Sequence, residues 1–106
     1  MFVELRQYRI QPGRSEEWVK YMEEELIPFQ VSKGMVVLGS WIGEQDPTVY
    51  VWMRRFESES ERERLYKAVY ESDTWKNRMS ARVGELIDRT QIVVTRLTAT
   101  PRSVIQ

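Results

Sequence analysis

The chain contains neither cysteine nor histidine among its 106 residues. Without cysteine there can be no disulfide, no thiolate nucleophile and no metal site built on sulfur, and this composition fits a reducing compartment. Without histidine there can be no imidazole general base, no Ser-His-Asp triad and no histidine-ligated zinc or haem. The side chains left for chemistry are carboxylates, arginines, tyrosines and tryptophans.

An excess of charge is also missing, because 16 lysines and arginines balance 16 aspartates and glutamates. Nucleic acids and anionic membranes are bound largely through excess positive charge, so neither is expected as a partner. No segment approaches the roughly 18 consecutive apolar residues of a transmembrane helix, and the first residues lack the pattern of a signal peptide. No group of carboxylates has calcium-loop spacing, so no metal site is predicted. These absences predict a cytoplasmic protein.

Hydrophobic periodicity predicts seven elements in the order β, α, β, β, α, α, β. Strands are predicted at 2–10, 35–44, 48–56 and 91–99, and amphipathic helices at 14–29 and from about 58 and 73. Pro28 is expected to disturb the last turns of the first helix, because proline has no N–H to donate to the preceding turn. No repeat, low-complexity tract or linker interrupts the pattern, so residues 1–106 are expected to form one domain.

This order of elements predicts an α+β fold. Two β-α-β units split by a hairpin place the helices on one face of a four-stranded antiparallel sheet, which is the ferredoxin-like βαββα(α)β arrangement. The opposite face of the sheet is then bare, although it carries apolar side chains. Stacking that face on a second copy would cover it, and closed twofold dimers are the commonest oligomers, so we expect a homodimer.

Five short motifs extend over nearly the whole chain: Glu4-Leu5-Arg6-Gln7-Tyr8, Pro12-Gly13, Gly39-Ser40-Trp41, Val49-Tyr50-Val51-Trp52 and Trp75. In order and spacing they resemble the NIPSNAP family. The resemblance implies a dimeric α/β barrel, in which two sheets face each other and the helices stay outside. The wider barrel superfamily includes cofactor-independent monooxygenases, haem-degrading enzymes, isomerases and proteins with no known reaction, so the fold does not choose a function.

Strand geometry indicates where a site could lie, because successive residues of a strand face opposite sides of the sheet. Seven side chains from three strands are assigned to one pocket face: Glu4, Arg6, Tyr8, Trp41, Tyr50, Trp52 and Arg54. An apolar and aromatic surface with a few converging polar groups is typical of a small-molecule pocket. The faces depend on the pairing register, which a single bulge would invert.

Three of these side chains are the candidate catalytic residues. Arg6 could bind a carboxylate or enolate oxygen with its planar guanidinium. Tyr8 could donate a hydrogen bond to the same oxyanion, or act as an acid if its pKa were lowered. Glu4 would orient Arg6, or act as the base if burial raised its pKa. Structural alternatives stay open: Glu4 and Arg6 form only an ion pair or an interface contact, and Tyr8 is simply buried.

The other four side chains of the pocket face are the candidate ligand-binding residues. Trp41 and Trp52 would wall a flat substrate, with Tyr50 and Arg54 beside them on the third strand. Tryptophan in a small domain more often fills the core or an interface, and that alternative also stays open. Trp75, at helical spacing with other apolar residues, is predicted to be a packing residue.

The function predicted is that each subunit binds a small organic molecule in a barrel pocket, with no cofactor. Monooxygenase-like or isomerase-like chemistry that needs no cofactor would suit such a site. The alternative is a non-catalytic homodimeric interaction or scaffold domain. A barrel without a cavity would favour the alternative, as would aromatic or methionine side chains exposed away from the dimer face.

Overall fold

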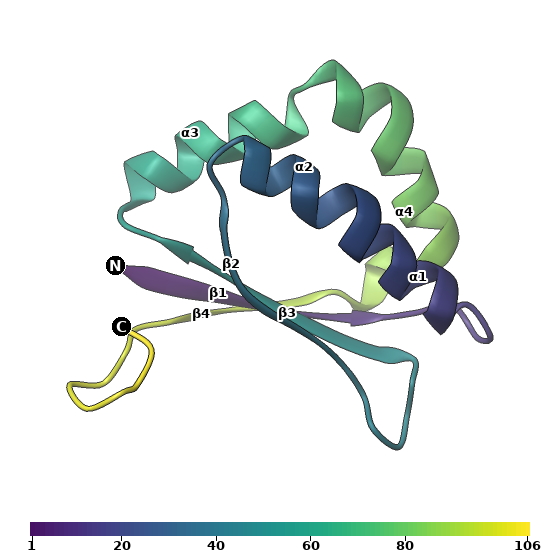
Figure 1. The fold of residues 1–106 in the computed structure, drawn as a ribbon, viewed down its shortest axis with the longest axis horizontal. Coiled ribbons are helices and arrows are strands. Elements are labelled where there is room, and N and C mark those ends of the chain that lie inside the picture. Colours follow the sequence, from purple (N-terminus) through teal and green to yellow (C-terminus); the bar gives the residue numbers. More distant parts are fainter.

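One antiparallel sheet of four strands organises the protein in the computed structural model, which describes residues 1–106. The strands are β1 (Phe2–Arg9), β2 (Val36–Ile42), β3 (Val49–Phe56) and β4 (Val93–Leu97). Their order across the sheet is β2-β3-β1-β4, so β1 and β3 form its centre. All the helices lie on one side of the sheet (Figure 1). The predicted α+β, ferredoxin-like topology is therefore confirmed.

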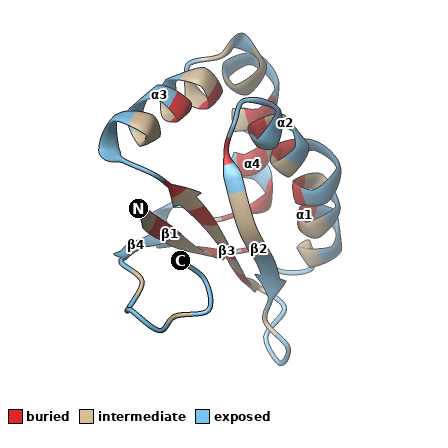
Figure 2. Cartoon of the chain, turned by 60° about the vertical axis from the view of Figure 1, so that its left-hand side comes forward, coloured by how far each residue is buried: buried red, intermediate tan, exposed pale blue.

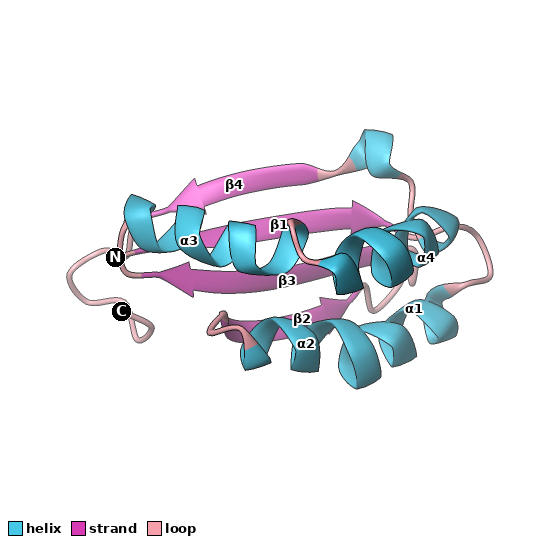
Figure 3. Ribbon diagram, turned by 90° about the horizontal axis from the view of Figure 1, so that it is seen from above, coloured by secondary structure: helices cyan, strands magenta, loops and turns pink.

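Two helical segments, called the first and second helical layers below, lie side by side over the sheet, as seen from above in Figure 3. The first comprises α1 (Ser15–Tyr21), the π-helical turn η1 (Met22–Leu26) and α2 (Ile27–Ser32), and the second comprises α3 (Glu59–Tyr70), the π-helical turn η2 (Trp75–Met79) and α4 (Ser80–Leu86). A short 3-10 turn, η3 (Arg89–Gln91), leads into β4. Pro28 lies in the first turn of α2, directly after η1. The helix is thus irregular where the proline removes a backbone donor, as the sequence predicted.

The hydrophobic core lies between the sheet and the helices, where Figure 2 shows the buried residues. Its largest cluster joins Trp18 and Met22 of the first helical layer to Tyr50 and Trp52 of β3. Trp18 is fully buried and its ring meets the edge of Tyr50 at a centroid distance of 5.7 Å. Because aromatic side chains bury large apolar areas, this cluster fixes how the first helical layer sits on the sheet.

The register of β1 against β3 brings the predicted site residues to one face. Glu4 lies opposite Arg54, Arg6 opposite Trp52, and Tyr8 opposite Tyr50. Side chains directly opposite each other on neighbouring strands point to the same side of a sheet. That side is the one that the helices cover, so the shared face predicted for β1 and β3 is confirmed.

The predicted face of Trp41 was wrong, because β2 contains a bulge. Val37 pairs with Arg54 and Gly39 pairs with Met53, so one extra residue is inserted between them. Every side chain after the bulge therefore points to the opposite face from the one that strict alternation gives. Trp41 lies on the uncovered face and is 50% exposed. A Cβ at Gly39 would collide with the ring of Trp41, so the glycine gives this ring room to lie along the strand.

The uncovered face of the sheet, called the outer face below, is mostly apolar, although Gln7, Arg55 and Thr95 also lie on it. It carries four large exposed side chains: Val36, Trp41, Val93 and Leu97. Val3 and Met53 lie between them, where they line a hollow under the C-terminal residues. The bare face expected from the topology is thus present. None of the helices combines the length and the apolar composition that crossing a bilayer requires.

Candidate functional site

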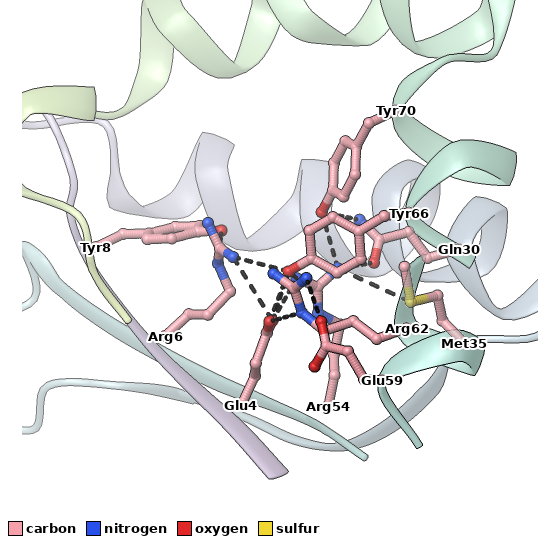
Figure 4. Close-up of polar contacts among 10 residues, drawn as sticks. All are labelled: Glu4, Arg6, Tyr8, Gln30, Met35, Arg54, Glu59, Arg62, Tyr66 and Tyr70. Atoms are coloured by element: carbon pink, nitrogen blue, oxygen red, sulfur yellow. Dashed lines mark hydrogen bonds and ion pairs between the residues drawn. The ribbon is translucent and has the colours of Figure 1, made fainter. Parts of the chain in front are cut away.

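A buried carboxylate stands at the centre of the polar contacts between the sheet and α3 (Figure 4). The side chain of Glu4 is only 1% exposed, and three arginines lie within ion-pair distance of it. Arg54 Nη2 donates to Oε1 at 2.9 Å, and Arg62 Nε donates to Oε2 at 2.8 Å. Tyr66 donates its hydroxyl proton to Oε1 at 2.6 Å. Both carboxylate oxygens of Glu4 are therefore already occupied by protein donors.

These contacts decide the protonation state of Glu4. Burial alone would raise the pKa of its carboxyl group, but hydrogen bonds from Tyr66 and Arg62 and the charge of Arg54 lower that pKa below the ordinary value of 4.5. Glu4 is therefore ionised at neutral pH, as a carboxylate surrounded by cationic donors should be. The hypothesis that burial turns Glu4 into a general base was wrong. Its carboxylate instead forms ion pairs with the surrounding arginines.

Arg54 contacts several other side chains inside the protein and does not reach solvent. Its side chain is 0% exposed, and Nη1 donates to Gln30 Oε1 at 2.9 Å and to the Tyr70 hydroxyl at 2.8 Å. Its guanidinium carbon lies 4.6 Å from the centroid of the Trp52 ring and 5.1 Å from that of Tyr66. Arg54 thus links β3 to α2 and α3 through charge-assisted hydrogen bonds and cation–π contacts.

A cavity of about 360 Å³ opens beside this polar cluster, between β1 and the second helical layer. Its lining combines two arginines with aromatic and aliphatic side chains: Arg6, Tyr8, Tyr66, Tyr70, Trp75, Arg89 and Ile92. The strand β1 supplies the floor, while α3 and η2 supply the aromatic wall. Pockets with mostly aromatic walls and a few polar groups suit small organic ligands.

Arg6 and Tyr8 form the polar floor of the cavity. Arg6 Nε donates to the Tyr8 hydroxyl at 3.0 Å and Nη1 donates to the Tyr66 hydroxyl at 3.2 Å. Arg6 lies farther from Glu4 than the other arginines do, with Nη1 3.6 Å from Oε1. Burial raises the pKa of Tyr8, so the hypothesis of an acid with a lowered pKa was wrong. Tyr8 keeps its proton, and its oxygen accepts the hydrogen bond from Arg6.

The structure brings together only part of the predicted site. Arg6 and Tyr8 line the cavity, and Glu4 lies beside Arg6 without lining the cavity (Figure 4). The remaining predicted ligand-binding residues lie elsewhere: Trp52 and Arg54 are buried beneath the cavity, Tyr50 is buried with its hydroxyl 2.6 Å from that of Ser40, and Trp41 is on the outer face. Their assignment to the cavity surface was therefore wrong.

Several cavity residues were not identified from the sequence. Tyr66 and Tyr70 were read only as part of the apolar stripe of a helix, although two hydroxyls four residues apart on one face could have indicated a polar wall. Burial raises the pKa of Tyr66 to about 12, so its hydroxyl stays protonated and donates to Glu4. Trp75 packs edge-on against Tyr70 at a centroid distance of 4.9 Å, yet it also lines the cavity. Arg89 lies at the cavity rim, where Nη2 donates to the carbonyl of Ser80 at 2.6 Å.

Comparison with known proteins gives one consistent result. The sequence model of the NIPSNAP family matches residues 3–101. A NIPSNAP family protein from Agrobacterium tumefaciens has a similar structure, with a TM-score of 0.88 at 24% identity over 99% of this chain and 98% of that one. An uncharacterized NIPSNAP domain protein from Burkholderia xenovorans gives 0.85 at 18% identity over 97% and 98%.

A structure described as an antibiotic biosynthesis monooxygenase is more distant, with a TM-score of 0.68 at 16% identity over 95% of this chain and 100% of that one. No curated protein matches the sequence. At these identities the similarity of structures establishes the fold and leaves the function to be argued from the site.

Proposed function

The chain belongs to the NIPSNAP family, and from that premise we propose that it binds a small organic molecule in the cavity beside Arg6 and Tyr8. The observation that carries the proposal is the Arg6–Tyr8 pair, joined by a 3.0 Å hydrogen bond at the floor of an aromatic cavity. A guanidinium that is 17% exposed at the bottom of such a cavity keeps part of its surface for a ligand. By contrast, the side chain of Arg54, which binds only other protein groups, is 0% exposed.

Any reaction in this cavity would use the same pair to stabilise an oxyanion, since preorganised donors act most strongly where charge develops away from water. The fold is shared with a protein described as an antibiotic biosynthesis monooxygenase, and this supports oxygenation as the reaction type. Isomerisation is the alternative reaction that the same pair of donors would suit. Glu4 is not available as a proton acceptor, because Arg54, Arg62 and Tyr66 occupy both of its oxygens. The proposed catalytic part is therefore limited to Arg6 and Tyr8.

The outer face supports a homodimer as the form in which the protein binds its ligand. Val36, Trp41, Val93 and Leu97 are all exposed there, and no helix covers them (Figure 2). Monomeric proteins rarely expose a continuous apolar surface of this kind. A second copy related by a twofold axis would cover the face and leave the cavity, on the opposite side of the sheet, open to solvent.

A non-catalytic interaction domain is the second candidate function, and one observation favours it. Trp41 is a large aromatic side chain on the outer face, and exposed tryptophan is enriched at the centre of protein–protein contacts. In that function the outer face would hold a different protein in place of a second copy, and the cavity would stay empty. This candidate therefore differs from the homodimeric interaction domain predicted from the sequence, whose exposed aromatic residues would lie away from the dimer face. The two functions place the ligand on opposite sides of the sheet, so ligand mapping separates them.

Substitutions at the cavity floor test the small-molecule proposal. In a ligand-observed NMR screen of small aromatic compounds, we expect Arg6→Ala to weaken the bound compounds about tenfold, the value of one charge-assisted hydrogen bond. Tyr8→Phe removes a single hydroxyl and should weaken them about threefold. Arg64→Ala, at an exposed position of α3 outside the cavity, is the matched control. Unchanged binding in both floor variants would refute the proposal.

A further inference from the structure

Positive charge exceeds negative charge around the cavity floor. Arg6, Arg54 and Arg62 all lie within 3.6 Å of a single carboxylate, that of Glu4. Arg62 reaches a second carboxylate, that of Glu59 at 3.5 Å, but Glu59 also pairs with Arg96 at 2.7 Å. Four guanidiniums thus share two carboxylates, and two positive charges remain uncompensated within the cluster.

The least compensated of these charges is the one that faces the cavity. Arg54 and Arg62 each have a carboxylate oxygen within 2.9 Å, whereas Arg6 is 3.6 Å from an oxygen that already accepts two shorter hydrogen bonds. Arg6 Nη2 has no hydrogen-bond partner in the protein, and its other nitrogens donate only to tyrosine hydroxyls. A partly buried guanidinium in this position is stabilised by an anion brought from outside.

Two tyrosine hydroxyls near Arg6 could also donate hydrogen bonds to a bound anion. The Tyr8 oxygen accepts from Arg6, and the Tyr70 oxygen accepts from Arg54 and from Gln30 Nε2 at 3.4 Å. Neither hydroxyl proton has an acceptor within the protein. Tyrosine hydroxyls both donate and accept, so each of these still has one donor to offer. The polar part of the cavity therefore presents donors from Arg6, Tyr8 and Tyr70 and no carboxylate.

The opposite part of the cavity is flat and apolar. Trp75 and Ile92 form its wall, and the ring of Tyr70 packs against Trp75. Arg89 lies at the rim and is exposed. A molecule that fills this space meets cationic donors at one end and aromatic faces along its body.

On the basis of the proposed function, we infer that the ligand is an organic anion, with a carboxylate or enolate head bound by Arg6, Tyr8 and Tyr70 and a flat apolar body against Trp75. A neutral amide would meet the same donors without the charge, and its NH₂ group would find no carboxylate to accept from it. An organic cation would face the uncompensated arginines. Charge of the head group is therefore the property by which this cavity selects its ligand.

Matched pairs of probes test the inference: benzoate with benzamide, phenylacetate with phenylacetamide, and cinnamate with cinnamamide. Each pair keeps the body and shape and changes only the charge of the head. Titrations at pH 7 followed by ¹H–¹⁵N NMR should shift the amide signals of the cavity residues Trp75 and Ile92. We expect each carboxylate to bind at least about tenfold more tightly than its amide, because hydrogen bonds to charged groups are roughly twice as strong as neutral ones.

The variant Arg6→Gln should remove most of this preference, because it should weaken carboxylate binding about tenfold and amide binding by no more than about threefold. Arg64→Gln, which changes the net charge equally, should keep the preference. If amides and carboxylates bound the cavity equally well, the inferred ligand class would be wrong although small-molecule binding would stand. If none of the six probes shifted cavity signals, the proposed function would fail with it. Should Arg6→Gln fold poorly, Tyr8→Phe provides the second reading, with an expected loss of about threefold in carboxylate affinity.

Discussion

Glu4→Gln is expected to lower the free energy of unfolding by about 3–5 kcal/mol, the usual cost of removing one partner from a buried ion pair. The substitution keeps the shape of the side chain and removes the only carboxylate within reach of Arg54, which is 0% exposed. Arg54 would then be a buried charge without a counter-ion. Chemical denaturation at one fixed protein concentration measures the change, since the stability of the proposed homodimer would depend on concentration.

Glu59→Gln is the matched control for this prediction. It removes the same charge from a side chain that is 49% exposed and pairs with Arg62 and Arg96 at the surface. Exposed ion pairs contribute at most about 1 kcal/mol, so the control should change stability by less than that. A loss at Glu4 no larger than the loss at Glu59 would show that the buried cluster does not hold the sheet to α3.

The stability lost in Glu4→Gln is also expected to depend on pH. The folded protein lowers the pKa of Glu4 below 4.5, so the carboxylate stabilises the fold above pH 4.5. This contribution is lost as the pH falls through the lowered pKa, because the folded state must then take up a proton. The stability difference between wild type and Glu4→Gln should therefore be full at neutral pH and should narrow in acid.

Trp41→Asp is expected to convert the proposed homodimer into a monomer. The side chain lies on the outer face, in a row across the sheet with Val51, Gln7 and Val93. If a second copy covers this face, the aspartate would be an unpaired charge in an apolar interface, at a cost of about 3 kcal/mol or more. The dissociation constant would rise at least roughly a hundredfold, which sedimentation equilibrium can measure.

Val31→Asp tests whether any exposed apolar residue would have the same effect. Val31 is 51% exposed, like Trp41, but lies on α2 on the other side of the molecule. It should leave the dimer intact. A wild-type protein that stays monomeric at micromolar concentration would show that there is no such dimer. A Trp41→Asp variant that remains dimeric would show that the two copies meet at another surface.

Topology was the part that local sequence patterns could predict. Strand alternation over 2–10 and 48–56, helical spacing over 14–29 and the short connection between the strands at 35–44 and 48–56 each depend on neighbours in sequence. Each was found close to its predicted place. Alternation also placed Glu4 and Arg54 on one face, but their ion pair was not predicted, because neither strand contains the register in which the two strands pair.

The contents of the cavity depend on contacts that no local pattern contains. The bulge between Val37 and Gly39 reversed the face of Trp41, and nothing in the alternation of β2 marks that inserted residue. Tyr66 and Tyr70 have the spacing of ordinary core residues, and only the packing of α3 on β1 turns their hydroxyls toward Glu4 and Arg54. Pairing alone also could not show that Arg54 is buried while Arg6 reaches the cavity.

A crystallographic fragment screen that includes the aromatic carboxylates described above tests the central claim most directly, because it shows where ligands bind without assuming a reaction. We predict carboxylate density between Arg6, Tyr8 and Tyr70, with the fragment bodies lying against Trp75. Fragments that gather on the outer face around Trp41, while the cavity beside Arg6 stays unoccupied by every carboxylate, would contradict the account and favour an interaction domain.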